Sequence, residues 1–200
     1  MKKIKIFVVC LTILMAAKSF GQNAEEVKGV RFGVKAGINI ANLTVKPADA
    51  ETSTGSLIGV TGGFFATIPG GAGFSVQPEL NYSGMGAKET ISNSKLLLNY
   101  LSIPVLAKYS LESAGFAAYL GPQFSYLLSA KAKASGVSID AKDQVKSTDI
   151  SGVIGVEYFV PAGIGLSARY QLGLTNIAKD TQAGESIKNK AITFTIGYRF

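Results

Sequence analysis

The last ten residues of the chain, 191–200, alternate between apolar and polar side chains and end on an aromatic residue. They read A-I-T-F-T-I-G-Y-R-F. Alternation with a period of two is typical of a strand that lies between an apolar and a polar environment. The same pattern recurs in seven earlier segments, at residues 31–42, 57–67, 73–83, 97–109, 115–128, 150–160 and 163–174. We therefore expect an all-β fold of eight antiparallel strands.

The connections between these segments alternate in length. Residues 68–72, 110–114 and 161–162 form short connections, whereas 43–56, 84–96, 129–149 and 175–189 are long, polar and lysine-bearing. Short turns at one end and long loops at the other are typical of outer-membrane barrels, with the turns in the periplasm and the loops outside the cell. An even number of strands then places both ends of the barrel in the periplasm.

The first 21 residues have the features of a secretory signal peptide. Three lysines precede an apolar run at residues 6–17, which is shorter than the ~20 residues of a spanning helix. Ser19 and Gly21 suit cleavage before Gln22, and Lys18 interrupts the run, which argues against a retained anchor helix. We expect residues 1–21 to be removed, 22–30 to form a short periplasmic segment and 31–200 to form an outer-membrane β-barrel domain.

Composition excludes several classes of function. The only cysteine, Cys10, lies in the expected signal peptide and lacks a small-residue lipobox, so we expect neither a disulfide nor a lipid anchor. Four of the 20 Lys and Arg residues leave with the signal, so 16 remain against 13 Asp and Glu, which is a poor argument for nucleic acid. The chain has no histidine. We therefore expect no catalytic centre, no metal site and no cofactor.

Alternation alone does not say which face of a barrel points inward, because a soluble lipocalin-like barrel has an apolar interior. Strands of about ten residues favour a membrane barrel, since soluble strands average about five or six. The polar face is rich in glycine, which lets larger side chains fit inside a narrow barrel. We therefore expect a transmembrane barrel with its apolar face toward lipid.

Charged residues in the strand bodies share the polar face, so we expect them inside the barrel. A cation on the lipid face at mid-bilayer costs roughly 2–4 kcal/mol. Eight strands leave an interior only wide enough for side chains, so a structural network is favoured over a transport path. The expected interior network consists of Lys35, Glu79, Lys108, Glu157, Arg169 and Arg199.

Aromatic residues gather near the strand ends, where the aromatic girdles of membrane barrels lie. Tyr100 lies near a strand end as well, and a bulge at Pro104 would turn it outward. Pro78, Pro104 and Pro122 lie inside strands, so we expect bulges or lost ladder bonds there. The expected girdle consists of Tyr82, Tyr109, Phe116, Tyr126, Tyr158 and Tyr198.

The segment 129–149 carries Lys131, Lys133, Lys142 and Lys146. Two interpretations stay open: a solvated mobile loop, which is the favoured one, and a binding site for lipopolysaccharide phosphates or a partner.

Several stretches resemble the PorT-like outer-membrane β-barrel family of Bacteroidetes. They are F-G-V-K-A-G-I-N-I-A-N-L, Q-P-E-L-N-Y-S-G-M-G-A-K, N-Y-L-S-I-P-V-L-A-K-Y, Y-L-G-P-Q-F-S-Y-L-L-S-A-K, R-Y-Q-L-G-L-T-N-I and the final I-G-Y-R-F. The resemblance implies a small barrel in the outer membrane. The member that names the family is linked to the type IX secretion system. Phe200 resembles the C-terminal aromatic by which such proteins are recognised for insertion.

The function that we expect is a structural or interaction role of a monomeric barrel. A component or accessory of a type IX secretion system is the first alternative, and a small selective channel and a lipid-modifying enzyme are weaker ones. The expected partners are outer-membrane lipids, lipopolysaccharide and the barrel-insertion machinery, with secretion-system subunits under the first alternative.

Overall fold

The structure, a computed structural model, describes residues 29–46, 52–89, 94–111, 114–134, 137–179 and 185–200. The expected signal peptide, 1–21, and nearly all of the segment 22–30 lie outside the described residues. No helix among the described residues is long and apolar enough to cross a membrane.

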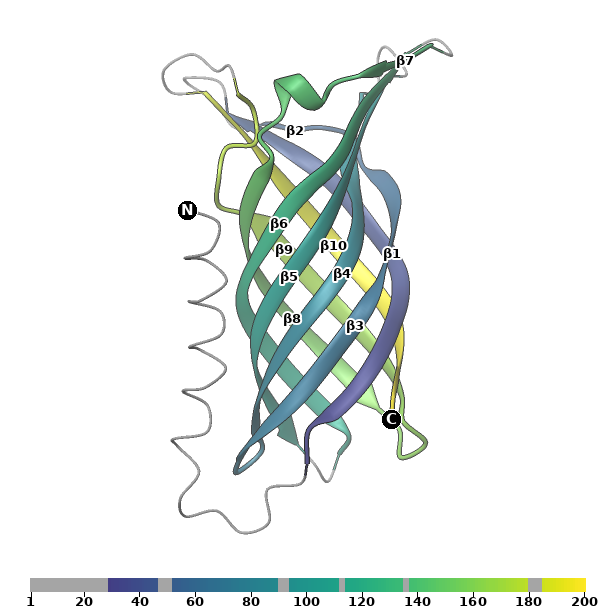
Figure 1. The fold of residues 1–200 in the computed structure, drawn as a ribbon, viewed down its shortest axis with the longest axis vertical. Helices are drawn as coiled ribbons and strands as arrows, with labels where there is room; N and C mark the ends of the chain where they lie inside the picture. The colour runs from purple at the N-terminus through teal and green to yellow at the C-terminus, as the bar shows by residue number, and fades with distance from the viewer. Residues whose placement is uncertain (1–28, 47–51, 90–93, 112–113, 135–136, 180–184) are drawn as a thin grey trace, which may run out of the picture.

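Eight long strands form a closed antiparallel barrel, as the alternation predicted (Figure 1). Around the barrel they follow the order β1, β3, β4, β5, β6, β8, β9 and β10, and β10 pairs with β1 to close it. The barrel strands are β1 (Arg31–Lys46), β3 (Leu57–Gly71), β4 (Phe74–Lys88), β5 (Lys95–Leu111), β6 (Phe116–Ala134), β8 (Thr148–Phe159), β9 (Ile164–Gly173) and β10 (Ser186–Arg199).

Three smaller elements lie at one end of the barrel. The short strand β2 (Thr52–Ser53) pairs with β1, and β7 (Val137–Asp140) pairs with the end of β6. A 3-10 turn, η1 (Lys142–Gln144), follows β7. We call this end the loop end and the opposite one, where short connections join β3 to β4, β5 to β6 and β8 to β9, the turn end.

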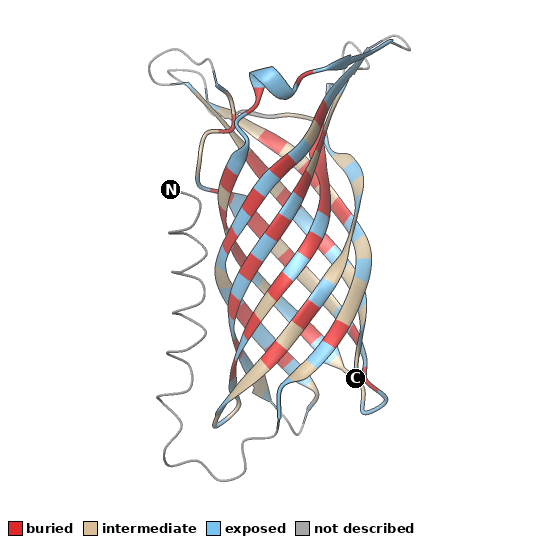
Figure 2. Ribbon diagram, in the orientation of Figure 1, coloured by how far each residue is buried: buried red, intermediate tan, exposed pale blue. Residues whose placement is uncertain are grey.

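Buried and exposed residues alternate along the strands (Figure 2). The exposed set is mostly apolar and the buried set of the strand bodies is mostly polar, so the apolar face points outward, which excludes the lipocalin-like alternative. Neighbouring residues in one strand show the contrast: Phe64 is 65% exposed, whereas Phe65 is 5% exposed. An outer surface of exposed Ile, Val, Leu and Phe around the whole barrel matches a lipid environment.

The strands are longer at the loop end than the sequence pattern predicted. The expected loop 84–96 is wrong for most of its length, because β4 runs to Lys88 and β5 begins at Lys95. In 129–149, β6 continues to Ala134 and β7 and η1 follow. At the turn end, β3 continues through Pro69 to Gly71, so the turn shrinks to Ala72 and Gly73, which both have positive φ.

Pro78, Pro104 and Pro122 interrupt strand pairing without shifting its register. The β4–β5 pairing stops at Pro78 and Val105 and resumes in the same register at Asn81 and Ser102. The β5–β6 pairing likewise skips the positions between Pro104 and Ala107, opposite Pro122. Lost ladder contacts are therefore confirmed, whereas the irregularities of register lie elsewhere, between Pro69 and Gly71 and between Asn99 and Tyr100.

Candidate functional site

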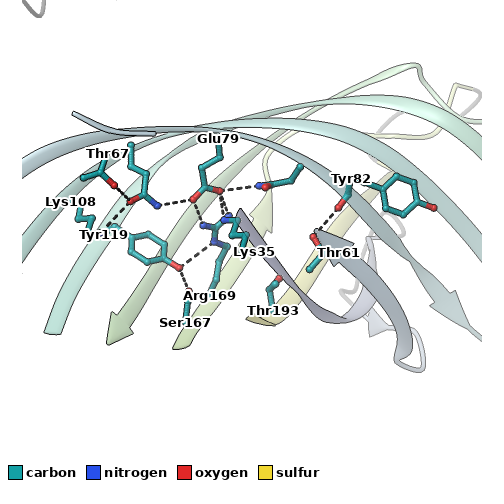
Figure 3. Close-up of polar contacts among 12 residues, drawn as sticks. Lys35, Thr61, Thr67, Glu79, Tyr82, Lys108, Tyr119, Ser167, Arg169 and Thr193 are labelled. Atoms are coloured by element: carbon teal, nitrogen blue, oxygen red, sulfur yellow. Dashed lines mark hydrogen bonds and ion pairs between the residues drawn. The ribbon is translucent and has the colours of Figure 1, made fainter. Parts of the chain in front are cut away.

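The centre of the barrel interior is a fully buried carboxylate, Glu79 on β4. Lys35 on β1 donates to Glu79 Oε2 at 2.6 Å. Arg169 on β9 donates from Nη1 to Oε2 and from Nη2 to Oε1, both at 2.9 Å, which is the bidentate geometry of a strong arginine–carboxylate pair (Figure 3). Gln77 and Asn81 donate two further hydrogen bonds to the same carboxylate, at 3.0 and 2.9 Å.

The Glu79–Arg169 pair connects opposite walls of the barrel. β4 and β9 lie four strands apart in a closed ring of eight, so the two side chains meet across its full width. Tyr119 on β6 extends the contact: Arg169 Nε donates to its hydroxyl at 3.3 Å, and that hydroxyl lies 2.6 Å from Ser167 Oγ. The charged layer therefore holds four of the eight strands, β1, β4, β6 and β9, at fixed distances.

A second ion pair joins Lys108 on β5 to Glu157 on β8, and both side chains are buried. Lys108 also donates to Gln77 Oε1 at 3.2 Å, and Thr67 donates to the same oxygen at 3.0 Å. Because Gln77 donates in turn to Glu79, the two ion pairs form one continuous network. Five of the six charged residues that the sequence assigned to the interior, all but Arg199, belong to it.

Arg199 differs from the expectation. In the described part of the chain it makes no ion pair with Glu79 or Glu157, and its guanidinium lies over the Phe159 ring, 4.6 Å from the centroid. Arg199 ends β10 at the turn end of the barrel, so its side chain reaches the mouth and not the middle. Arg199 thus lies on the polar face, as expected, but outside the ion-pair network to which it was assigned.

Glycine makes room for the large interior side chains. A Cβ on Gly155 would lie 2.6 Å from the Tyr119 hydroxyl, one on Gly33 would lie 2.2 Å from the Phe65 ring, and one on Gly165 would lie 2.5 Å from the Phe159 ring. The glycine-rich inner face thus accommodates the aromatic rings that fill the turn end and flank the charged layer.

A second polar layer lies nearer the loop end and centres on Asp149, which is 1% exposed. The carboxylate accepts from Thr175 Oγ1 at 2.7 Å, from Asn189 Nδ2 at 3.0 Å and from Ser151 Oγ at 3.3 Å. Asn189 also donates to the Tyr100 hydroxyl at 3.2 Å, which again links opposite strands, β10 and β5. All of these donors to Asp149 are neutral groups.

Sequence reasoning missed this second layer. It placed Asp149 at the end of a loop and left Tyr100 near the girdle, whereas Tyr100 is 1% exposed inside the barrel. A signal was present, because Asp149 has the same parity as Glu157 in one continuous strand and Tyr100 has the same parity as Lys108. Extending the alternation of inward and outward residues along both strands would have placed Asp149 and Tyr100 inside the barrel.

Replacing Asp149 with alanine is expected to lower the free energy of unfolding by about 1–2 kcal/mol, because the buried Asn189 and Ser151 and the half-buried Thr175 lose their acceptor, while the two hydroxyls can turn to others. Urea unfolding of the refolded barrel measures this loss. Asp140→Ala is the control, since Asp140 is exposed and accepts a local bond from the Lys142 amide. Equal stability of the two variants would contradict a structural role of the second layer.

The loop end of the interior is closed by an apolar cap. Backbone bonds tie its covering segments together: Lys146 N–H donates to Ile177 O at 2.7 Å, and Ile177 N–H donates to Ile187 O at 2.8 Å. The solvated-loop interpretation of 129–149 is therefore wrong for Ala141 and Val145, which are buried in the cap. The cap consists of Ala41, Leu43, Met85, Ala87, Leu98, Tyr100, Leu127, Ala130, Ala141, Val145, Ile177 and Ala191.

A small interior cavity lies beside the charged layer. The described residues enclose an interior cavity of about 20 Å³ beside Lys35, Arg169 and Glu157, which is enough for about one water molecule. Among the described residues, no group of three or more His, Cys, Asp and Glu side chains lies close enough to hold a metal ion. The arrangement is a filled and crosslinked interior.

The aromatic residues assigned to the girdle all lie on the outer face. Two pairs are in ring contact near the turn end, where the Tyr109 ring packs on Phe74 at 4.8 Å and the Phe116 ring packs on Tyr158 at 4.7 Å. Phe200 is 70% exposed, packs edge-on against Tyr198, and donates its backbone N–H to Phe32 O at 2.9 Å. Tyr82 and Tyr126 face outward nearer the loop end.

Comparison with solved structures supports the same architecture. The chain resembles the Neisserial surface protein A (NspA), with a TM-score of 0.55 and 13% identity over 86% of this chain and 100% of that one. It also resembles Ail, the attachment invasion locus protein of Yersinia pestis, solved with the heparin analogue sucrose octasulfate, with a TM-score of 0.51 and 15% identity over 86% and 100%. At these identities the likeness concerns the fold alone.

No curated protein matches the sequence. A family model described as "Outer membrane protein beta-barrel domain" matches residues 20–179, which is most of the chain. The filled eight-stranded barrel, its apolar outer face and this match agree with one another. The chain therefore belongs to the outer membrane protein beta-barrel domain family, and the barrel lies in the bacterial outer membrane.

Proposed function

We propose that this protein has a structural or interaction role in the outer membrane and no catalytic activity. The observation that carries the proposal is the closure of the interior at every level. The charged layer around Glu79, the polar layer around Asp149 and the apolar cap follow one another along the interior, and the cavity beside the charged layer is about 20 Å³. A chain with such an interior acts through its outer surfaces and its extracellular end.

A mild-detergent pull-down of the tagged protein from native outer membranes, with mass spectrometry of the recovered proteins, tests this role. We expect recovery of defined outer-membrane partners in stable proportion, or of the barrel with lipopolysaccharide. If the purified barrel itself generated a modified lipid, this would instead favour the lipid-modifying enzyme and contradict the proposal.

The same experiment tests the finer alternative, a PorT-type component or accessory of a type IX secretion system. The support for this alternative is the resemblance of six stretches that span the barrel, among them the tyrosine-leucine-x-isoleucine-proline stretch at Tyr100–Pro104 on β5. Co-purification of secretion-system subunits would favour it. A pull-down without them, from cells that express the secretion system, would remove it.

The channel alternative leads to a separate prediction. Purified protein in planar bilayers is expected to show no reproducible single-channel openings, because the ion pairs and the cap block the path. Glu79→Ala, which removes the acceptor of both Lys35 and Arg169, is the comparison, because leakage through the barrel should be easier to detect in this variant than in wild type. Regular openings of the unmodified protein would overturn the filled-interior interpretation and favour a selective channel.

A further inference from the structure

Three lysines lie directly opposite one another on neighbouring strands at the loop end. Lys88 on β4 pairs with Lys95 on β5, and Lys95 pairs in turn with Lys133 on β6. We call these three residues the lysine row. Directly opposite side chains in an antiparallel pair have Cβ atoms about 4.5–5.5 Å apart, and like charges in such positions are destabilising.

The lysine row lies on the outer face of the barrel wall. Lys88 follows the buried cap residue Ala87, and Lys95 lies on the face of β5 opposite to that of the buried cap residue Leu98. Lys95 and Lys133 are exposed and Lys88 is half-buried. Lys131, two residues from Lys133 on the same face of β6, is exposed as well and lies opposite Leu97.

Nearby carboxylates do not balance these charges. Asp140 on β7 lies opposite Lys131, and Glu89 follows Lys88 in the chain. Among the described residues, four lysines thus face two carboxylates, which leaves an excess of positive charge. Lysines that protect a sheet edge from aggregation would lie on the outermost strand, β7, yet β7 carries none. The row runs across the ends of three neighbouring strands, since Lys88 ends β4, Lys95 begins β5 and Lys133 lies next to the end of β6, so one ligand can contact all three ammonium groups.

The height of the row identifies the surface that it meets. The last apolar positions on the outer face are Leu97 on β5 and Leu128 on β6, and the lysines are the next charged outward positions above them. Because the short turns lie in the periplasm, this end of the barrel emerges from the outer leaflet. The row is therefore level with the head groups just above the acyl chains, where lipopolysaccharide carries its phosphates.

We propose that Lys88, Lys95 and Lys133, with Lys131 beside them, form a binding site for the phosphate groups of lipopolysaccharide in the outer leaflet. Several ammonium groups on one rigid sheet would bind a multiply charged phosphorylated saccharide through charge-assisted hydrogen bonds. The ligand would also relieve the repulsion within the row. This inference goes beyond the proposed interaction role, and its test is independent of any protein partner.

The test compares binding of lipopolysaccharide to the full-length mature barrel in detergent micelles for three forms of the protein. The row variant carries Lys88→Gln, Lys95→Gln and Lys133→Gln. The control variant carries Lys142→Gln, Lys146→Gln and Lys179→Gln, which removes the same charge from the segments that cover the loop end. All three forms are first checked for folded, heat-modifiable migration on gels, so that a folding defect is not mistaken for a binding defect.

We expect the row variant to bind phosphorylated lipopolysaccharide about tenfold more weakly than wild type, since three charge-assisted contacts are lost. The control variant should bind within about twofold of wild type, because a solvated charge distant from the ligand contributes little. Wild type should lose a similar factor with enzymatically dephosphorylated lipopolysaccharide. Raising the salt concentration should weaken binding to wild type more than binding to the row variant.

Three results would overturn the site. Wild-type affinity of the row variant would show that the lysines do not contact the ligand. Equal affinity of wild type for phosphorylated and dephosphorylated lipopolysaccharide would remove phosphate as the recognised group. Row-dependent binding of soluble heparin, without row-dependent binding of lipopolysaccharide, would assign the lysines to a sulfated polysaccharide and equally overturn the proposal.

Discussion

Replacing Glu79 with alanine is expected to lower the free energy of unfolding by about 3–5 kcal/mol, because it leaves two buried cations without their partner. Lys35 and Arg169 both donate to this carboxylate, and their side chains are 10% and 8% exposed. Gln77 and Asn81 lose an acceptor in the same step. The loss should exceed that of Glu157→Ala, which frees one cation, Lys108.

Urea unfolding of the barrel in lipid vesicles measures the effect. The chain has no tryptophan, so far-UV circular dichroism or gel mobility is the suitable probe. Asp143→Ala, an exposed carboxylate on η1, is the matched control and should change stability by less than about 0.5 kcal/mol. A Glu79→Ala barrel as stable as this control would show that the central ion pairs do not hold the walls together.

A variant that lacks all three central charges separates the effect of unpaired charge from the effect of lost hydrogen bonds. Converting the whole centre to apolar residues, with Glu79→Leu, Arg169→Met and Lys35→Met, removes the unpaired charges together. Buried ion pairs replaced in this way are often neutral or gain stability. The triple variant should therefore be more stable than Glu79→Ala alone. A triple variant that is less stable would mean that hydrogen bonds, and not charge balance, dominate this layer.

The sequence predicted which side chains face inward better than it predicted which of them meet. Alternation is a local property of the pleat, so Glu79, Lys108 and Arg169 were assigned to the interior from their own strands. Their pairing depends on the tilt and stagger of all eight strands around the barrel, which no single strand records. For that reason Arg199 was assigned to the correct face but wrongly to the ion-pair network, whereas it lies at the turn-end mouth beside Phe159.

The loop end was the hardest part to predict, and the reason is physical. Above the acyl chains both faces of a strand contact water or the cap, so polar and apolar residues no longer alternate by environment. The extension of β6 reads S-A-K-A-K-A and that of β4 reads G-M-G-A-K, which resemble loops in composition. Pairing with neighbours nonetheless continues there, in the ladder that brings Lys88, Lys95 and Lys133 together.

One glycine makes this extension possible. Gly86 on β4 has a φ of +132°, a conformation that residues with a side chain rarely adopt. A Cβ built there would lie 1.9 Å from the backbone carbonyl oxygen of Leu96 and 3.2 Å from the Leu57 side chain. Backbone atoms in a paired strand cannot move aside as the end of a flexible side chain can. Both the conformation and the space therefore require glycine at this position.

Replacing Gly86 with alanine is accordingly expected to cost about 2–4 kcal/mol, from backbone strain and from overpacking against β5. Gly152→Ala on β8 is the matched control, because a Cβ there would meet nothing within 4 Å and its φ is not positive. That substitution should be neutral or stabilise by about 0.4–1 kcal/mol through the unfolded chain. Urea unfolding in lipid vesicles compares the two variants.

The region that Gly86→Ala unfolds is as informative as the loss of stability that it causes. Gly86 lies between the cap residues Met85 and Ala87, so the variant should separate the extensions of β4 and β5 and open the cap while the charged layer around Glu79 stays intact. Trypsin then reports the change, because Lys88 and Lys95 lie on these extensions and should be cleaved faster in Gly86→Ala than in Gly152→Ala. Equal cleavage and equal stability of the two variants would mean that β4 tolerates a side chain at Gly86, contrary to the close approach of Leu96. Faster cleavage with little loss of global stability would instead show that the loop end unfolds as a unit of its own above a barrel held by its central ion pairs.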